Sequence, residues 1–200
     1  MAKANWVKID RNSGSGNGAV NVTTYSKHTG RVARQSLLLF KAAGVETEQS
    51  TVYQAGTPEY VDIADSMSSD AQGQVVTISG VSNSSRLVFS LGTGNLQVVL
   101  PTHYIANSIE TENGAAINGD PGAQGEYQFS IKVTVPANDG TTTLSRQIVV
   151  TDDAGNKDVC DLTLAAGEPY IRVSLKLIEL DNLGTPVTVY VESNTNWTVE

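Results

Sequence analysis

Two histidines are the residues of this chain best suited to acid–base chemistry near neutral pH, because an imidazole titrates close to pH 6.5. His28 lies in an expected turn, and His103 follows Pro101 just beyond an expected strand. Neither belongs to a recognisable motif with a serine or cysteine, so the arrangement that activates a nucleophile is not indicated. We interpret both histidines as structural or solvent-exposed and name no catalytic residue.

Four oxygen-bearing side chains close together could hold a calcium ion: Asp152, Asp153, Asn156 and Asp158. Their spacing does not match a calcium-binding loop. Asp and Asn are also the usual residues of a hairpin turn, because their short side chains bond to the nearby backbone. We therefore expect a turn here, and we expect neither a metal ion nor a cofactor.

Three other patterns fall short of a catalytic site. Glu110 and Glu112 lie in a polar stretch without the apolar pocket that would raise the pKa of one carboxyl, as a glycosidase requires. The glycines at 14, 16 and 18 do not open a helical pattern, so they predict no phosphate loop. Cys160 is the single cysteine, which excludes an internal disulfide, and we interpret it as a small strand residue. We expect that the protein is not an enzyme.

The two tryptophans could stack on sugar rings and so bind a glycan. However, Trp6 alternates with Val7 and Ile9, and Trp197 is followed by Val199, as in strands with an apolar face. A β-sandwich needs large side chains in its core. We therefore favour core positions for both tryptophans and keep a glycan platform as the alternative.

The net charge is −8, and it is distributed unevenly. Residues 1–45 carry seven Lys or Arg and one acid, and the remaining residues carry six basic and twenty acidic groups. The basic residues do not cluster with aromatics, so we do not expect nucleic acid as a partner. We favour attraction between the basic front of one molecule and the acidic body of another.

Export and membrane signals are not indicated by the sequence. No apolar run reaches the length of a membrane span. The N-terminus has no signal-peptide pattern, so we expect either use without Sec export or a chain that begins at an artificial boundary.

Strands must position these side chains, because apolar and polar residues alternate through most of the chain. The clearest run is 127–135, in which five residues should be nearly buried on one face: Tyr127, Phe129, Ile131, Val133 and Val135. Further strands are expected at 6–9, 19–25, 34–40, 47–54, 75–81, 86–90, 96–100, 145–151, 158–164, 170–177 and 186–191. A short helical turn is expected before Gln74, and a long polar loop over 107–125. This spacing is typical of an antiparallel sandwich of the immunoglobulin type.

An internal repeat organises the chain. One offset in residue number, called here the repeat offset, relates four places: Gly56 to Gly167, Pro58 to Pro169, Ser82-Asn83 to Ser193-Asn194, and Val22-Thr23 to Val133-Thr134. Two full copies of such a unit do not fit in 200 residues, so one copy is whole and the other is cut in two. We expect a complete immunoglobulin-like domain at 58–167, the C-terminal part of a split domain at 1–57, and the N-terminal part of one at 169–200.

Several motifs of the split domain resemble one family: SNTNW at 193–197, NWVKI at 5–9, SGSGNG at 13–18, an Arg-led strand at 34 and TVYQAG at 51–56. Together they resemble the BACON domain, an immunoglobulin-like module common in Bacteroidetes proteins and in the crAss-like phages that infect them. In the usual order of that module, the motif at 193–197 comes first. The resemblance covers about 1–57 and 169–200, while 58–167 lacks both tryptophans and has a longer loop. These motifs are turn and core residues, so they indicate the fold better than the function.

Two functions of different classes remain open. The first is a structural protein of a phage virion, a capsid, tail or fibre component assembled in the host cytoplasm with copies of itself and other virion proteins. The second is a carbohydrate-binding or spacer module of a secreted or surface Bacteroidetes protein. We favour the first, because catalysis is not indicated and phage surfaces often carry such modules.

The split repeat predicts how copies would meet. The first and last strands of such a sandwich run parallel, so 1–57 and 169–200 should leave 58–167 at opposite ends. Each half alone would expose unpaired strand edges. We therefore expect 170–199 of one molecule to complete the sandwich begun by 6–54 of a neighbour. The alternative is closure within one chain, as a circular permutant. The expected interface residues are Trp6, Val7, Ile9, Val187, Val189, Val191, Trp197 and Val199.

Overall fold

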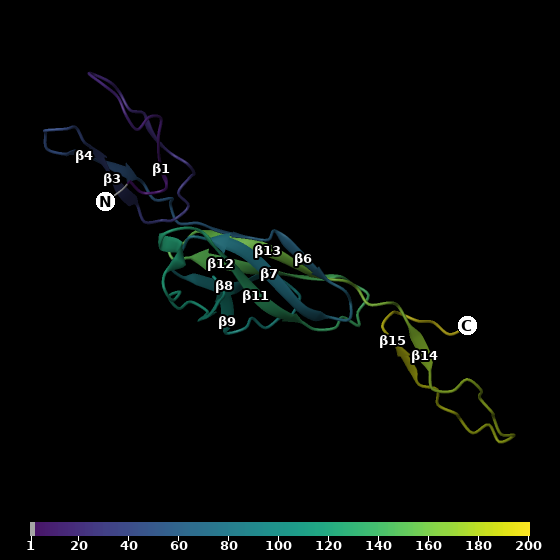
Figure 1. The fold of residues 1–200 in the computed structure, drawn as a ribbon. Helices are drawn as coiled ribbons and strands as arrows, with labels where there is room; N and C mark the ends of the chain where they lie inside the picture. Colours follow the sequence, from purple (N-terminus) through teal and green to yellow (C-terminus); the bar gives the residue numbers. More distant parts are fainter. Residues whose placement is uncertain (1–2) are drawn as a thin grey trace.

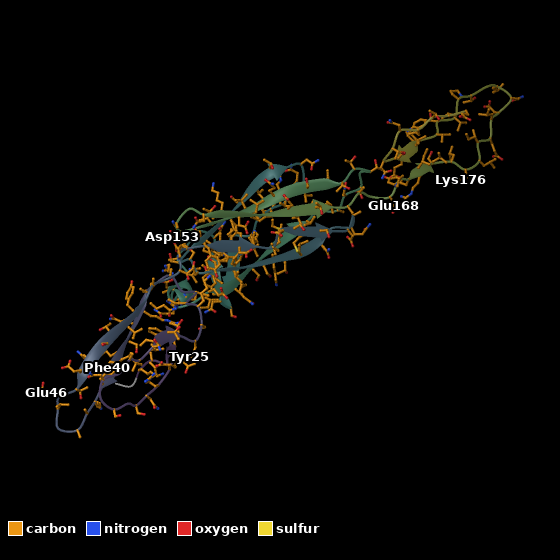
Figure 2. The ribbon with its side chains drawn as sticks, turned by 90° about the horizontal axis from the view of Figure 1, so that it is seen from above. Tyr25, Phe40, Glu46, Asp153, Glu168 and Lys176 are labelled. Carbon is orange, nitrogen blue, oxygen red and sulfur yellow. The ribbon has the colours of Figure 1, made fainter. Side chains whose placement is uncertain are left out.

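A computed structural model describes residues 3–200, and over that range the chain contains fifteen β-strands and one short 3-10 turn. A β-sandwich lies in the middle, and a smaller β segment extends from each of its two ends (Figure 1). The turned view places Phe40 and Glu46 at one end of the molecule and Lys176 at the other (Figure 2). The prediction of an all-β, antiparallel sandwich fold is confirmed.

Residues 58–167 form two packed sheets. The first has the order β10-β9-β11-β7-β5, and its strands are β5 (Val61–Ile63), β7 (Gln74–Ser82), β9 (His103–Ala106), β10 (Ile109–Glu112) and β11 (Tyr127–Val135). The second has the order β6-β13-β12-β8, and its strands are β6 (Ser66–Ser69), β8 (Leu87–Gly94), β12 (Leu144–Asp152) and β13 (Lys157–Leu164). The two longest antiparallel ladders, β7–β11 and β12–β13, lie at the centre of these sheets.

The chain enters and leaves this sandwich at opposite ends. The first two strands of the sandwich belong to different sheets: β5 pairs with β7 in the first sheet, and β6 then pairs in parallel with β13 in the second. Val61 lies opposite Ser82 at the entry end, and Leu164 lies opposite Ser69 at the exit end. A strand of nine residues such as β11 spans about 30 Å, so the two ends lie about that far apart.

The core of the sandwich lies between the two sheets. Phe129 of β11 meets Phe89 of β8 edge to face, with ring centroids 5.8 Å apart, and the ring of Tyr104 lies 5.0 Å from that of Phe89. The predicted burial of five alternating residues in 127–135 is confirmed, because none of them is more than 4% exposed. Aromatic pairs of this geometry add to the free energy of apolar burial.

Two local predictions within the sandwich differ from the structure. The stretch before Gln74 holds no helix: residues 66–69 form β6, because the parallel neighbour β13 supplies the backbone hydrogen bonds, and a tight turn follows in which the N–H of Gly73 donates to the carbonyl oxygen of Asp70 at 3.2 Å. Residues 96–100 are buried at Leu96 and Val98 but form no strand, and Val99 makes a single bridge to Thr134. The expected loop over 107–125 carries β10 and the 3-10 turn η1 (Pro121–Ala123).

The N-terminal segment consists of two separate strand pairs. β1 (Val7–Ile9) pairs with β2 (Val22–Thr24), and β3 (Arg34–Phe40) pairs with β4 (Glu48–Gln54). Strand β2 is shorter than the expected 19–25, whereas β3 has the expected bounds.

The C-terminal segment holds one strand pair, β14 (Ile171–Val173) with β15 (Val191–Ser193). Strand β14 is shorter than the predicted 170–177. The prediction of a strand at 186–191 is wrong, because residues 186–190 form no strand and β15 shares only Val191 with that range. Most of the stretch between them is exposed.

Candidate assembly interface

The candidate catalytic residues do not converge on a site. His28 is buried, with its Nε2 2.8 Å from the carbonyl oxygen of Val32, so it fixes a loop. The exposed His103 has its Nδ1 2.9 Å from the hydroxyl of Thr102. Cys160 is buried in β13, and burial raises the pKa of its thiol to about 11, far from that of a nucleophile at neutral pH.

The acids considered for calcium are engaged within the fold. Asp152 accepts bonds from the backbone and side-chain nitrogens of Asn156 at 2.8 and 2.7 Å, which closes the hairpin. Asp153 pairs with Arg86, and Asp158 accepts the backbone N–H of Ile63 at 2.7 Å. Within residues 3–200, no three His, Cys, Asp or Glu side chains are grouped so as to hold a metal ion.

The junction between the N-terminal segment and the sandwich is built around Asn83, which is fully buried. Its Nδ2 donates to the carbonyl oxygens of Thr29 and Pro58, both at 3.1 Å, and its Oδ1 accepts the backbone N–H of Tyr60 at 2.9 Å. The backbone N–H of Thr57 also donates to the carbonyl oxygen of Gly30 at 2.9 Å. One side chain thus ties the preceding segment to the first strand of the sandwich.

The junction at the far end repeats these bonds. The Nδ2 of Asn194 donates to the carbonyl oxygens of Asp139 and Glu168 at 2.7 and 2.9 Å, and its Oδ1 accepts the N–H of Tyr170 at 2.9 Å. The backbone N–H of Gly167 donates to the carbonyl oxygen of Gly140 at 2.7 Å. This bond corresponds to the one from the N–H of Thr57 to the carbonyl oxygen of Gly30 in the first joint. The sequence repeat is therefore also a repeat of one joint.

Close backbone approach explains the glycines of the repeat. A Cβ on Gly56 would collide with the carbonyl oxygen of Arg31, and a Cβ on Gly167 would collide with that of Asn138. Only glycine fits where two stretches of backbone approach so closely. The first joint is further held by Arg31, which pairs with Asp120, and this hydrogen bond raises the pKa of the guanidinium.

The hairpin of the N-terminal segment matches a pair of the sandwich in register. In β3–β4, Arg34 lies opposite Gln54, and in β12–β13 Leu144 lies opposite Leu164. The residue numbers of these matching positions differ by one less than the repeat offset. The other end of this hairpin matches at the same spacing, with Phe40 opposite Glu48 and Val150 opposite Asp158.

The C-terminal pair β14–β15 corresponds in a similar way to β5–β7. Ile171 lies opposite Ser193, as Val61 lies opposite Ser82. Each terminal segment therefore contains strands of the sandwich that the other lacks: the N-terminal segment has counterparts of β11, β12 and β13, and the C-terminal segment has counterparts of β5 and β7.

Several strand edges of the terminal segments carry no neighbour within residues 3–200. In the sandwich, β11 lies between β9 and β7, and β12 lies between β13 and β8. Their counterparts β2 and β3 are each bonded on one edge, to β1 and to β4. β15 is likewise bonded to β14 on one edge, whereas its counterpart β7 lies between β11 and β5. These are edges at which another strand can add.

Apolar side chains that are buried in the sandwich are exposed at the matching positions of the terminal segments. The exposed fractions are 36% for Val20 against 1% for Ile131, 45% for Phe40 against 0% for Val150, and 41% for Val187 against 4% for Val76. Both terminal segments therefore expose apolar side chains at positions that correspond to core positions of the sandwich.

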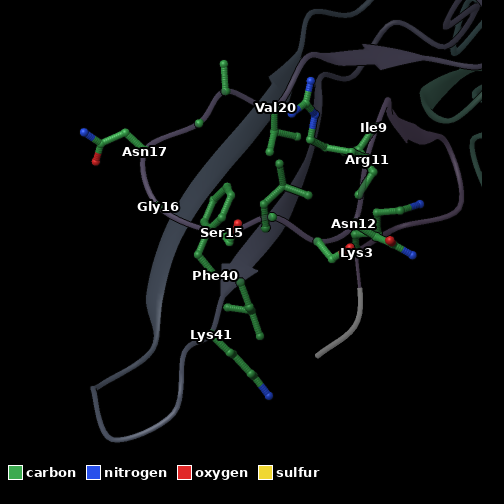
Figure 3. Close-up of a pocket in the computed structure, with 16 residues that line it drawn as sticks. Lys3, Ile9, Arg11, Asn12, Ser15, Gly16, Asn17, Val20, Phe40 and Lys41 are labelled. Carbon is green, nitrogen blue, oxygen red and sulfur yellow. The ribbon is translucent and has the colours of Figure 1, made fainter.

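A cleft of about 610 Å³ opens where the core of the N-terminal segment would continue. Figure 3 shows Ile9 and Val20 on one side of this cleft and Phe40 on the other. Leu38 and Leu39 also line it, and the glycine-rich loop at 12–18 forms its rim. A cleft of this size between two strand pairs can receive apolar side chains of an added strand.

The eight predicted interface residues lie in the two terminal segments, at opposite ends of the molecule. Val7 is buried inside the N-terminal segment, and Ile9 lines the cleft. Trp6 is half-buried, with the guanidinium of Arg34 4.6 Å from its ring. Trp197 is 49% exposed and Val199 is largely exposed, so neither occupies a core within this chain.

The three C-terminal valines of that set, Val187, Val189 and Val191, alternate along the chain, with Val187 exposed and the other two half-buried. The expectation did not include Val20, Leu38 and Phe40, which line the cleft. The repeat could have identified Val20, because the repeat offset places it at the core residue Ile131.

Comparison with known proteins adds no assignment, since no family model matches the chain and no curated protein matches it. Among residues 3–200 there is no helix long and apolar enough to cross a membrane.

Proposed function

We propose that this chain is a non-enzymatic structural protein of a phage virion, a capsid, tail or fibre component, whose copies assemble head to tail by strand complementation. The C-terminal segment of one copy completes the sandwich that the N-terminal segment of the next copy begins. Its partners are copies of itself and other virion proteins, and it needs no cofactor.

The observation that carries this proposal is the complementary content of the two ends. The N-terminal segment holds counterparts of the last strands of the sandwich, and the C-terminal segment holds counterparts of the first strands. Because they lie at opposite ends of the molecule, one copy does not bring its own halves together (Figure 1). Addition of a strand from another chain is an established way to satisfy such edges.

Charge supports the same pairing. The N-terminal segment, residues 1–57, carries seven Lys or Arg and three acids, whereas residues 169–200 carry two basic and four acidic residues. The N-terminal segment of one copy therefore attracts the C-terminal segment of another copy, whereas two N-terminal segments, or two C-terminal segments, repel each other. Such attraction raises the rate of association, and added salt weakens it.

The virion assignment rests on the resemblance to modules of crAss-like phages and on the assembly just described. Mass spectrometry of purified particles tests it, and we expect the chain as a component present in many copies. Its absence from particles that contain other structural proteins would contradict the assignment while leaving the assembly intact.

Removal of residues 169–200 tests the assembly. We expect the shortened chain to remain monomeric where the whole chain associates, because the added strands are lost. The middle sandwich keeps its own core in this variant, so circular dichroism serves as the control for folding. Association that persists after the deletion would contradict strand complementation.

A carbohydrate-binding or spacer module is the second candidate, and one observation favours it. Trp197 is half-exposed and lines a shallow pocket with Pro169 and Tyr170, and aromatic faces of this kind can stack on sugars. If assembly is the function, soluble polysaccharides should cause no saturable quenching of tryptophan fluorescence. Sub-millimolar, saturable quenching would favour the carbohydrate-binding module.

A further inference from the structure

The sandwich itself contains the pairing that the two terminal segments lack. Strand β11 pairs with β7 along nine residues, with Ile131 opposite Ile78 and Val133 opposite Val76. All four side chains belong to the core and are at most 4% exposed. This ladder is a template for the contact between two copies.

The repeat offset shows which residues of the terminal segments correspond to the β7–β11 ladder. The repeat offset places Val20 and Val22 at the positions of Ile131 and Val133 in β11. It also places Val187 and Val189 at the positions of Val76 and Ile78 in β7. The matching register of β14–β15 and β5–β7 supports this alignment of the C-terminal segment.

Resting on the proposed function, we propose that residues 185–193 of one copy pair antiparallel with β2 of a second copy in one defined register. Val189 lies opposite Val20, and Val187 lies opposite Val22. The side chain of Val189 then meets Val20 in the cleft beside Phe40, and that of Val187 meets Val22 next to Ile9. The second copy is thus the specific occupant of the open edge of β2.

This register has a consequence for the shape of the assembly. The edge of β2 and the edge of β15 lie at opposite ends of one copy, so the contact is heterologous, and copies add one after another. Both joints of the chain use the same asparagine-centred bonds. Successive sandwiches, whole and completed, therefore follow each other through one repeated joint.

Four single-cysteine variants test the register: Ala19→Cys, Asn21→Cys, Thr188→Cys and Tyr190→Cys. The template pairs Ser130 with Ser79 and Lys132 with Thr77, so the register places 19 opposite 190 and 21 opposite 188. These positions face solvent in the two segments. The crossed pairs, 19 with 188 and 21 with 190, combine the same four variants two residues out of this register and serve as the control.

The variants are mixed in pairs at a concentration at which the whole chain associates, and one of each pair carries a tag. Directly opposed residues suit a disulfide, whereas Cα atoms two residues out of register lie about 7–8 Å apart, so we expect at least about fivefold more mixed disulfide from the matched pairs. Cys160 is buried, and the unsubstituted chain controls for its background.

The outcomes separate the register from the proposed function. Preferential cross-linking of both matched pairs supports the register. Equal or greater cross-linking of the crossed pairs, or none by any pair, in a chain that still associates would overturn the register and leave head-to-tail assembly standing. A chain that stays monomeric and gives no mixed disulfide would overturn both.

Discussion

The middle sandwich and the two terminal segments carry the same strand patterns with opposite outcomes. Of 22 buried apolar residues among residues 3–200, 20 lie in the sandwich, and of 25 exposed large apolar residues, 19 lie in the terminal segments. The terminal segments are thus not poor in apolar residues. Within residues 3–200, each of their sheets has only two strands, so these residues have few neighbours against which to pack.

The comparison shows that strand length in this protein depends on neighbours more than on local sequence. Strand β11, bonded on both edges, runs for nine residues, whereas its counterpart β2, bonded to β1 alone within the described chain, runs for three. The apolar alternation at Val20 and Val22 matches that at Ile131 and Val133. Cross-strand contacts therefore decide where the strand ends.

The largest expected effect contrasts two phenylalanines. Phe129→Ala removes a buried ring from the sandwich and should lower its free energy of unfolding by about 3–5 kcal/mol. Phe40→Ala removes a half-exposed ring from the cleft, so the monomer should lose little stability while association weakens. Urea denaturation measures the first effect and sedimentation the second. A Phe129 variant as stable as the parent would contradict the described core.

Much of this contrast could be predicted from the sequence. The alternation in 127–135 predicts β11 with its bounds and its buried face, and the repeat offset predicts which terminal residues correspond to it. The strand β6 could not be predicted, because the sequence from Ser66 to Ser69 has little strand propensity and depends on its parallel pairing with β13.

The two joints could be predicted only in part. The repeat identified Asn83 and Asn194, but not their bonds to Thr29 and Asp139, which lie far from them in the sequence. Likewise, the polar stretch at 107–125 predicted a loop and not its contact with Arg31. Contacts of this kind depend on how separate elements pack, which no local pattern encodes.

A smaller effect distinguishes the two joints. Asn83→Ala leaves buried backbone groups without a partner and should cost about 1–3 kcal/mol of unfolding free energy. Asn194→Ala removes the matching bonds at a more exposed joint, so the monomer should lose less. Urea denaturation compares the two variants, and an equal loss would contradict the described difference in burial.

The smallest effect concerns alkaline pH. Burial raises the pKa of Tyr104 to about 12, whereas the hydroxyl of an unfolded chain ionises near pH 10. The folded sandwich keeps this proton between pH 10 and 12 while the unfolded chain loses it, so stability falls as pH rises through that window. Between pH 9 and pH 11 we expect Tyr104 to contribute about 1 kcal/mol to this loss, to which the raised pKa values of Tyr127 and Tyr60 add. Urea denaturation of Tyr104→Phe, which lacks the ionising group, should show a smaller loss.

Sedimentation of the whole chain over a range of concentrations tests head-to-tail assembly most directly. The complementary ends predict an average mass that rises above the 21.2 kDa of one chain as concentration increases, and that falls back towards it when salt screens the opposite charges of the ends. A single species of 21.2 kDa at every concentration would contradict head-to-tail assembly.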